Sequence, residues 1–123
     1  MRTTLRPISL VAAQLLWSLS ACQAPPSPPT AQDVSRAETL RPADAALAAL
    51  YERSCLSCHS TVSAAPLTGF AAAWAPRLEQ GMDVLVSHAR DGFKGMPAKG
   101  LCNDCSDDDL RHLIQFMTQS HAL

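Results

Sequence analysis

Cys55-Leu56-Ser57-Cys58-His59 is the stretch that decides the fold of this 123-residue chain. Side chains three and four positions apart share one face of a helical turn, so both thiols and the imidazole point to the same side. C-x-x-C-H is the attachment pattern of a c-type haem, in which the two sulfurs bond the porphyrin and the histidine binds the iron. We therefore expect Cys55 and Cys58 to hold one covalent haem c, with His59 as its first axial ligand.

Met96 is the expected second axial ligand. It lies in the run Gly95-Met96-Pro97-Ala98-Lys99-Gly100, where glycine and proline predict a loop. A thioether in such a loop has no helix face to pack on, which favours iron binding over the alternative of a methionine that fills a gap. Met82 and Met117 fall on apolar helical stripes and are expected in the core. Ligation by one histidine and one methionine raises the reduction potential of a haem.

Two filled axial positions leave the iron without a place for a substrate. The site would then only gain and lose single electrons, which predicts an electron carrier rather than an enzyme, with no small-molecule substrate. The alternative from another class is a haem-based sensor or small-ligand binder, in which Met96 is labile and yields to the incoming molecule.

Cys102 and Cys105 form a second pair with the same spacing. Together with Cys55 and Cys58 they would suit a four-cysteine zinc site, or they would form a redox-active dithiol. Asp104 and its acidic neighbours oppose thiolate formation, although a helix N-terminus favours it. We favour a small structural disulfide, which would fix the turn between the Met96 loop and the last helix at a gain of about 2 kcal/mol.

The first 21 residues are typical of a signal peptide for export. Two arginines precede an apolar run, Ile8–Leu19, that is too short to span a membrane. The tetrapeptide Leu19-Ser20-Ala21-Cys22 resembles a bacterial lipoprotein signal, in which Cys22 would be lipidated; the alternative is an ordinary signal peptide and a free thiol. We expect a lipid anchor on the periplasmic side of the bacterial envelope, with Gln23 favouring the outer membrane.

Residues 22–41 are expected to form the lipid-anchored tether, and residues 42–123 the folded domain. Four prolines in the seven residues 24–30 favour an extended, semi-stiff segment. Removal of the signal peptide takes two of the ten basic residues, so eight remain against eleven acidic ones, a net charge of −3. This mildly acidic balance argues against a nucleic-acid partner.

Helical periodicity runs through the folded part, and no alternating strand pattern is present, so we expect an all-α domain. One helix is predicted over residues 43–53 and another over the apolar stripe that begins at Met82 and ends before Gly92. Residues 71–76 are expected to be a short helical turn or a loop closed by proline, and residues 94–100 an extended loop. Ser106 is typical of an N-cap; the helix after it would bury Leu110, Leu113, Ile114 and Met117.

Four longer motifs resemble the cytochrome c5 family of class I cytochromes c. They are Trp74-Ala75-Pro76-Arg77, Gly81-Met82-Asp83, the run from Gly92 to Gly100, and Cys102-Asn103-Asp104-Cys105-Ser106-Asp107. The resemblance covers residues 47–118. It implies the small cytochrome c fold of three to four helices around one haem, a disulfide between Cys102 and Cys105, and electron transfer in a bacterial respiratory chain.

The resemblance also assigns roles to further residues. It implies that the Pro66 carbonyl accepts the His59 ring N–H and that Tyr51 and Phe116 meet where the first and last helices cross. It also implies that Trp74 and Arg77 bind or screen a haem propionate; the alternatives are a core tryptophan and a surface arginine. The family usually has glycine at the position of Leu47, so a shift of this crossing is expected. Redox partners would bind briefly, and Lys94 and Lys99, close to the expected haem edge, would steer an acidic one.

Overall fold

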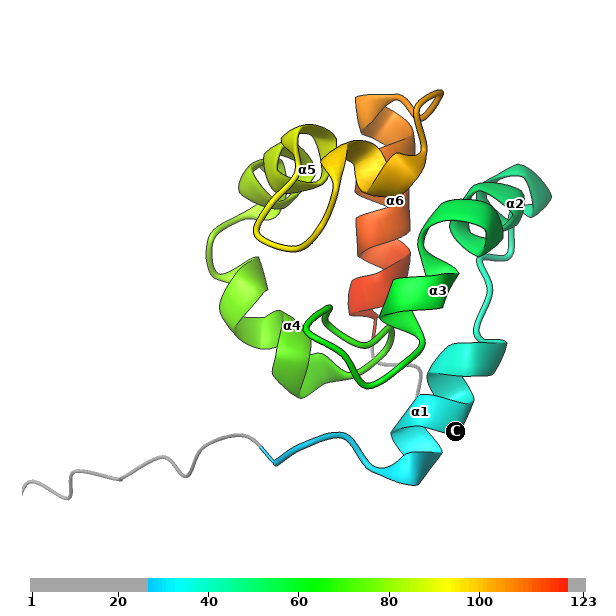
Figure 1. The fold of residues 1–123 in the computed structure, drawn as a ribbon, viewed down its shortest axis with the longest axis vertical. Helices are drawn as coiled ribbons and strands as arrows, with labels where there is room; N and C mark the ends of the chain where they lie inside the picture. The colour runs from blue at the N-terminus through cyan, green and yellow to red at the C-terminus, as the bar shows by residue number, and fades with distance from the viewer. Residues whose placement is uncertain (1–26, 120–123) are drawn as a thin grey trace, which may run out of the picture.

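Helices alone build the part of the chain that the structure describes, residues 27–119 of the computed structural model (Figure 1). Within this range no strand forms, and the only bridge is an isolated one between Phe93 and Met96. The all-α prediction is confirmed. None of these helices is long and apolar enough to cross a bilayer. The elements are α1 Ala31–Thr39, α2 Ala45–Ser54, α3 Leu56–His59, α4 Ala71–Leu78, α5 Met82–Asp91, the 3₁₀ helix η1 Ala98–Leu101 and α6 Asp107–Thr118.

The C-terminal helix α6 is the centre of the core. It begins with a capping box, in which the Ser106 hydroxyl accepts from the Asp109 backbone N–H and the Asp109 carboxylate accepts from the Ser106 N–H. The predicted apolar stripe is confirmed, because one face of the helix is buried against α5 and α2. The buried residues are Leu110, Leu113, Ile114, Phe116 and Met117.

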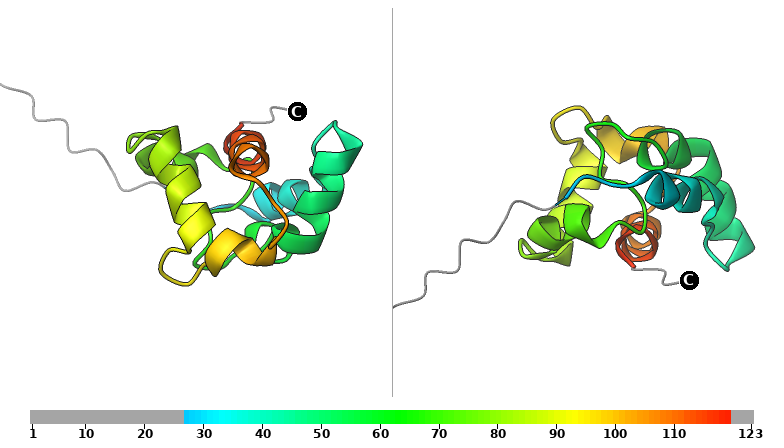
Figure 2. Two further views of the ribbon diagram at one scale, coloured as in Figure 1. Left: turned by 90° about the horizontal axis from the view of Figure 1, so that it is seen from above. Right: turned by 90° about the horizontal axis from the view of Figure 1, so that it is seen from below.

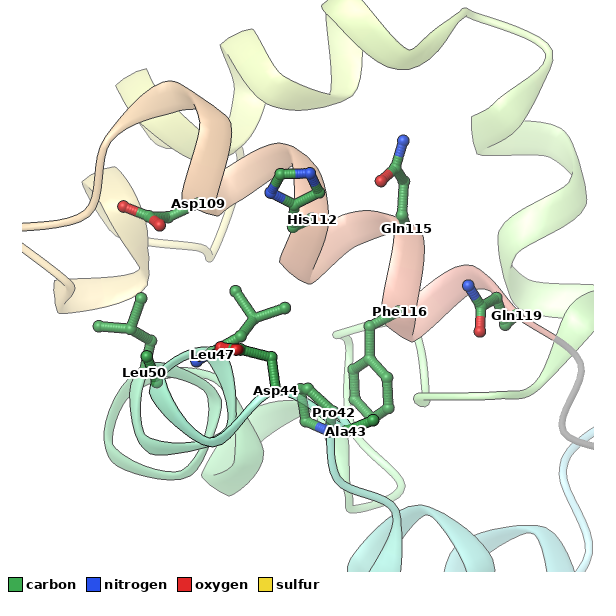
Figure 3. Close-up of a pocket in the computed structure, with 11 residues that line it drawn as sticks. Pro42, Ala43, Asp44, Leu47, Leu50, Asp109, His112, Gln115, Phe116 and Gln119 are labelled. Atoms are coloured by element: carbon green, nitrogen blue, oxygen red, sulfur yellow. Dashed lines mark hydrogen bonds between the residues drawn. The ribbon is translucent and has the colours of Figure 1, made fainter.

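Helices α2 and α6 cross at an aromatic contact. The rings of Tyr51 and Phe116 meet edge to face, with centroids 5.0 Å apart and planes at 78°, a favoured geometry for such pairs. Leu47, where the family has glycine, lies one turn before Tyr51 and is half-buried. It lines a groove of about 550 Å³ between the two helices, together with Leu50 and Phe116 (Figure 3). The aromatic contact therefore forms with a leucine at this position.

Residues 31–39 form helix α1, where an extended tether was predicted. The Thr30 hydroxyl and the Asp33 carboxylate make a capping box, and Asp33 pairs with Arg36 one turn later. Ala37 is completely buried, so the helix is packed on the domain, and Figure 2 shows α1 from above and from below. The Arg41 Nε then donates to Glu52 Oε1 of α2 at 2.7 Å, which fixes the end of α1. The predicted signal peptide and Cys22 lie outside the described residues.

Two shorter segments also differ from expectation. The helix α4 continues past Pro76 to Leu78, although proline has no N–H for the carbonyl four residues earlier; it ends within the next turn, before Gly81, whose φ of +90° suits glycine. The loop after α5 was predicted to be extended throughout, but its second half tightens into η1, a short turn in which Lys99 and Gly100 depart from helical backbone angles. This compact ending turns the chain back toward α6.

Leu47→Gly tests the effect of leucine at the crossing. We expect Leu47→Gly to lower the free energy of unfolding by more than Ala49→Gly does, because the exposed Ala49 loses only helix propensity, about 1 kcal/mol, whereas Leu47 also loses packing against the core. Denaturant unfolding of both variants measures the difference. A Leu47→Gly variant that is more stable than Ala49→Gly would show that leucine strains this crossing.

Candidate functional site

The C-x-x-C-H stretch lies on one helical turn. Cys55 sits at the junction of α2 and α3, and its carbonyl accepts from the backbone N–H groups of Cys58 at 3.3 Å and His59 at 3.0 Å. Both cysteines are free thiols; Cys55 is buried and Cys58 is exposed. Burial raises the pKa of the Cys55 thiol to about 11, with a smaller contribution from Cys58. The turn therefore carries two free thiols, four residues and one residue before the imidazole.

His59 is held in one orientation and one protonation state. Its ring is 6% exposed, and its Nδ1 lies 2.8 Å from the Pro66 carbonyl oxygen. Because a carbonyl only accepts, Nδ1 carries the proton and Nε2 keeps its lone pair for a metal. Burial lowers the pKa of His59; the Pro66 hydrogen bond opposes this shift, and the positive charge of Arg77 adds to it. The imidazole is therefore neutral at neutral pH, as a metal ligand must be.

The loop that carries Pro66 is fastened directly after this residue, at Leu67 and Thr68. The Thr68 backbone N–H donates to the His59 carbonyl at 2.8 Å, and the Thr68 hydroxyl shares a hydrogen bond with the Tyr51 hydroxyl at 2.9 Å. The Trp74 indole N–H donates to the Leu67 carbonyl at 2.9 Å. Thr68 and Leu67 are buried, so these bonds are shielded from water. The position of the Pro66 carbonyl is thus set by the core.

Trp74 lies in the core, as one of the two alternatives expected, and the haem-propionate role of Trp74 and Arg77 stays a prediction. The indole N–H of Trp74 is already bonded to the Leu67 carbonyl, and the Trp74 ring lies nearly parallel to the His59 ring, with centroids 6.0 Å apart. Trp74 therefore holds the histidine and its loop. Arg77 donates to the Ala73 carbonyl of its own helix, and its charge acts on His59.

Met96 lies in a turn that depends on glycine. The backbone N–H groups of Phe93 and Met96 each donate to the other's carbonyl, at 3.0 and 2.9 Å. Gly92 has φ +86°, and a Cβ there would lie 3.1 Å from the Met96 carbonyl oxygen and 3.0 Å from the Ala98 nitrogen. The Met96 side chain is half-buried and packs against the core cluster. In Figure 1 this yellow segment lies above the green segment that contains α3 and the His59 loop.

The second cysteine pair forms a disulfide, with the Cα atoms of Cys102 and Cys105 5.3 Å apart. Both residues are 1% exposed, which opposes a role in thiol exchange. The bond also removes these sulfurs from the four-cysteine zinc site, and residues 27–119 contain no other group of three or more metal-binding side chains. Arg53 of α2 donates to both carboxylate oxygens of Asp104 within the turn, each at 2.7 Å, and holds the Asp104 pKa below its usual range.

The donor set of the site fits a covalent haem. Two free thiols on one turn, a neutral imidazole with an available Nε2 and a thioether on a separate loop are the groups that a c-type haem requires. Sequence reasoning missed the residues that hold these groups, namely Thr68, Leu67 and Arg53. Arg53 and Asp104 are 51 positions apart, so no local spacing indicates their contact. The groove in Figure 3 contains none of the donors.

In comparisons with known proteins, the matching family and the similar proteins are all named as cytochromes. Residues 42–117 match the family described as cytochrome c oxidase, cbb3-type, subunit III. The chain is 44% identical over 74 residues to cytochrome c-555 of Chlorobaculum tepidum, a match that covers 56% of this chain and 68% of that protein. It is 42% identical over 72 residues to cytochrome c5 of Ectopseudomonas mendocina, covering 56% and 83%.

Among solved structures, the chain resembles one from a crystal structure of the electron transfer complex of nitrite reductase with cytochrome c. The TM-score is 0.54 at 36% identity, and the match covers 61% of this chain and 93% of that chain. Helix α1 lies before the matched family region.

Trp74→Phe tests the hold on the His59 loop. We expect this substitution to lower the free energy of unfolding by about 1–3 kcal/mol, because the buried Leu67 carbonyl loses its donor. Val62→Ala is the control, since Val62 is 69% exposed on the same loop and should change stability by less than about 0.5 kcal/mol. Unaltered stability with a shifted reduction potential would instead favour contact between Trp74 and a propionate.

Proposed function

This chain belongs to the family of c-type cytochromes described as subunit III of cbb3-type cytochrome c oxidase, and from this premise we propose that His59 and Met96 are the axial ligands of its haem. The protein is an electron carrier with one covalent haem c and is not an enzyme, in common with the cytochromes c5 and c-555 that it resembles. A haem c supplies a one-electron Fe(II)/Fe(III) couple.

The state of His59 is the observation that carries the proposal. Its Nδ1–H bond to the Pro66 carbonyl leaves only Nε2 for the iron, and it makes the imidazole a stronger donor. A fixed ring also lowers the rearrangement that accompanies gain or loss of an electron. Cys55 and Cys58, on the same turn, would bind the porphyrin covalently and keep its iron at this ring.

The contacts of Met96 favour an iron with both axial positions filled over an iron with one free position. Its side chain packs against the core, so displacement of the thioether would lose this packing, and the two backbone bonds to Phe93 hold the loop in place. A sensor needs a ligand that leaves easily, and these contacts oppose that behaviour. We therefore place electron transfer ahead of ligand sensing.

The partner would be another redox protein in a bacterial respiratory chain, met in a brief encounter. The similar cytochrome c in the nitrite reductase complex supports this kind of partner. Lys94 is exposed near Met96 and is available to steer an acidic surface, whereas the Lys99 ammonium is bonded to backbone carbonyls and is a weaker candidate for this role. Contacts of this kind are small and depend on ionic strength.

The location would be the periplasmic side of the cell envelope, with a lipid on Cys22 as the anchor. This part of the proposal is supported by the sequence Leu19-Ser20-Ala21-Cys22 behind an apolar run. Several acyl chains on one residue hold a protein stably on a membrane. The outer membrane is favoured because Gln23, rather than aspartate, follows the cysteine.

Met96→Ala tests the ligation. We expect the variant to lose the low-spin spectrum, to bind carbon monoxide when reduced and to show a potential lower by on the order of 0.1 V, within the range of about 0.8 V that axial ligands span. Absorption spectroscopy and redox titration measure these changes, with Met82→Ala as the control because Met82 packs against the core from α5. Rapid carbon monoxide uptake by the reduced wild-type protein would favour the sensor.

Cys22→Ser tests the anchor. We expect the native protein to fractionate with membranes and the variant to be released in soluble form, because the acyl chains supply the membrane affinity. Intact mass of the purified native protein should show both haem and lipid. A native mass that includes haem and an unmodified Cys22 would contradict lipidation without affecting the electron-transfer proposal.

A further inference from the structure

Two lysines flank Met96 in unlike surroundings. Lys94, two residues before it, is exposed, with its Nζ 5.2 Å from the centroid of the Phe93 ring. Lys99, three residues after it, is half-buried, and its Nζ donates to the Cys105 carbonyl at 2.8 Å and to the Asn103 carbonyl at 3.3 Å. The same charge is therefore solvated on one side of Met96 and bonded to backbone on the other.

The backbone at Lys99 is in a conformation that side chains rarely adopt. Lys99 has φ +56°, Gly100 +57° and Leu101 +69°, so three consecutive residues are left-handed. Only the glycine accepts this region without a steric cost. Leu101 is 72% exposed and contributes little burial in return. Such a turn persists only where other contacts determine it, and the two hydrogen bonds of the Lys99 ammonium are contacts of this kind.

The carbonyls that receive the ammonium belong to a rigid frame. The disulfide closes the segment from Cys102 to Cys105, and the Cys105 backbone N–H donates to the Cys102 carbonyl at 3.0 Å. Arg53 holds Asp104 of the same segment with two bonds of 2.7 Å. The frame is thereby connected to α2, the helix that leads into Cys55.

The backbone at Lys99 and Gly100 also lies next to the Met96 thioether. Gly100 is buried, and a Cβ at its position would lie 3.4 Å from Met96 Cε, the methyl carbon on the sulfur. The Gly100 backbone N–H also donates to the Pro97 carbonyl at 2.9 Å. A shift of the 99–100 backbone would therefore change the space against which the end of the Met96 side chain rests.

We propose that Lys99 is a positioning residue for Met96, whose ammonium fastens the Met96 loop to the disulfide turn and so holds the thioether at the iron. The inference rests on the proposed ligation by Met96. Lys99 acts through the backbone of the loop and does not itself contact the haem iron. The lysine at position 94 carries the same charge on the same loop and has no such function.

The test compares Lys99→Leu with Lys94→Leu in the haem-containing protein. Both variants remove one positive charge, keep an apolar stem and introduce no new iron ligand. Added imidazole competes with Met96 for the iron, so its apparent affinity, followed by absorption, reports how firmly the thioether is held. We expect Lys99→Leu to bind imidazole about tenfold more tightly than wild type, as for the loss of one charge-assisted hydrogen bond, and Lys94→Leu to stay within about twofold.

The outcomes separate the inference from the ligation on which it rests. Equal imidazole affinities in the two variants would overturn the role of Lys99, as would a Lys99→Leu variant with a lower unfolding midpoint but wild-type imidazole affinity. Lys99→Gln, measured in the same way, should shift in the same direction as Lys99→Leu. If Met96→Ala shows the wild-type spectrum and imidazole affinity, the ligation itself is wrong, and the role of Lys99 falls with it.

Discussion

The hydrogen bond between the His59 ring and the Pro66 carbonyl is the contact on which the site depends. It determines which nitrogen carries the proton, and hence which nitrogen can bind a metal. Residues of the surrounding core hold the Pro66 carbonyl in position for this bond. Thr68 and Trp74 fasten the loop directly after Pro66, at residues 67 and 68, and Tyr51 connects it to the crossing of α2 and α6. A change in packing at that crossing would therefore alter the position of the His59 imidazole.

A second set of contacts holds the other side of the site. Arg53 and Asp104 connect the end of α2 to the disulfide turn, and Lys99 connects that turn to the Met96 loop. The pair of Arg53 and Asp104 is solvent-exposed, so it contributes little to stability by itself. The pair acts on geometry instead, because it connects the helix before the C-x-x-C-H turn to the disulfide turn, to which Lys99 fastens the Met96 loop.

The sequence predicts the parts whose chemistry is local. The C-x-x-C-H spacing, the glycine- and proline-bounded Met96 loop and the Ser106 cap each indicate their structure within a few residues. The Pro66 acceptor was available only through family resemblance. Arg53, Thr68 and the carbonyl partners of Lys99 could not be found, because their contacts join distant segments or backbone atoms.

Part of the same reason explains the error over helix α1. Its polar composition and the prolines before it favour an extended chain, and the prediction followed these features rather than the capping pattern of Thr30 and Asp33, which is typical of a helix start. The capping box of Thr30 and Asp33 is local, but the burial of Ala37 and the contact between Arg41 and Glu52 both require the folded domain. Tertiary packing thus decides the conformation of this segment.

Helix α1 limits how far the domain can travel from its proposed attachment point. A helix advances about 1.5 Å per residue, against about 3.1 Å for an extended proline-rich chain. Because nine residues of the predicted tether fold into α1, the tether is shorter by about 14 Å. With a lipid on Cys22, the eight steps to Thr30 can span at most about 28 Å. The domain would then exchange electrons only close to the membrane surface, and redox centres held farther from the bilayer would be out of its reach.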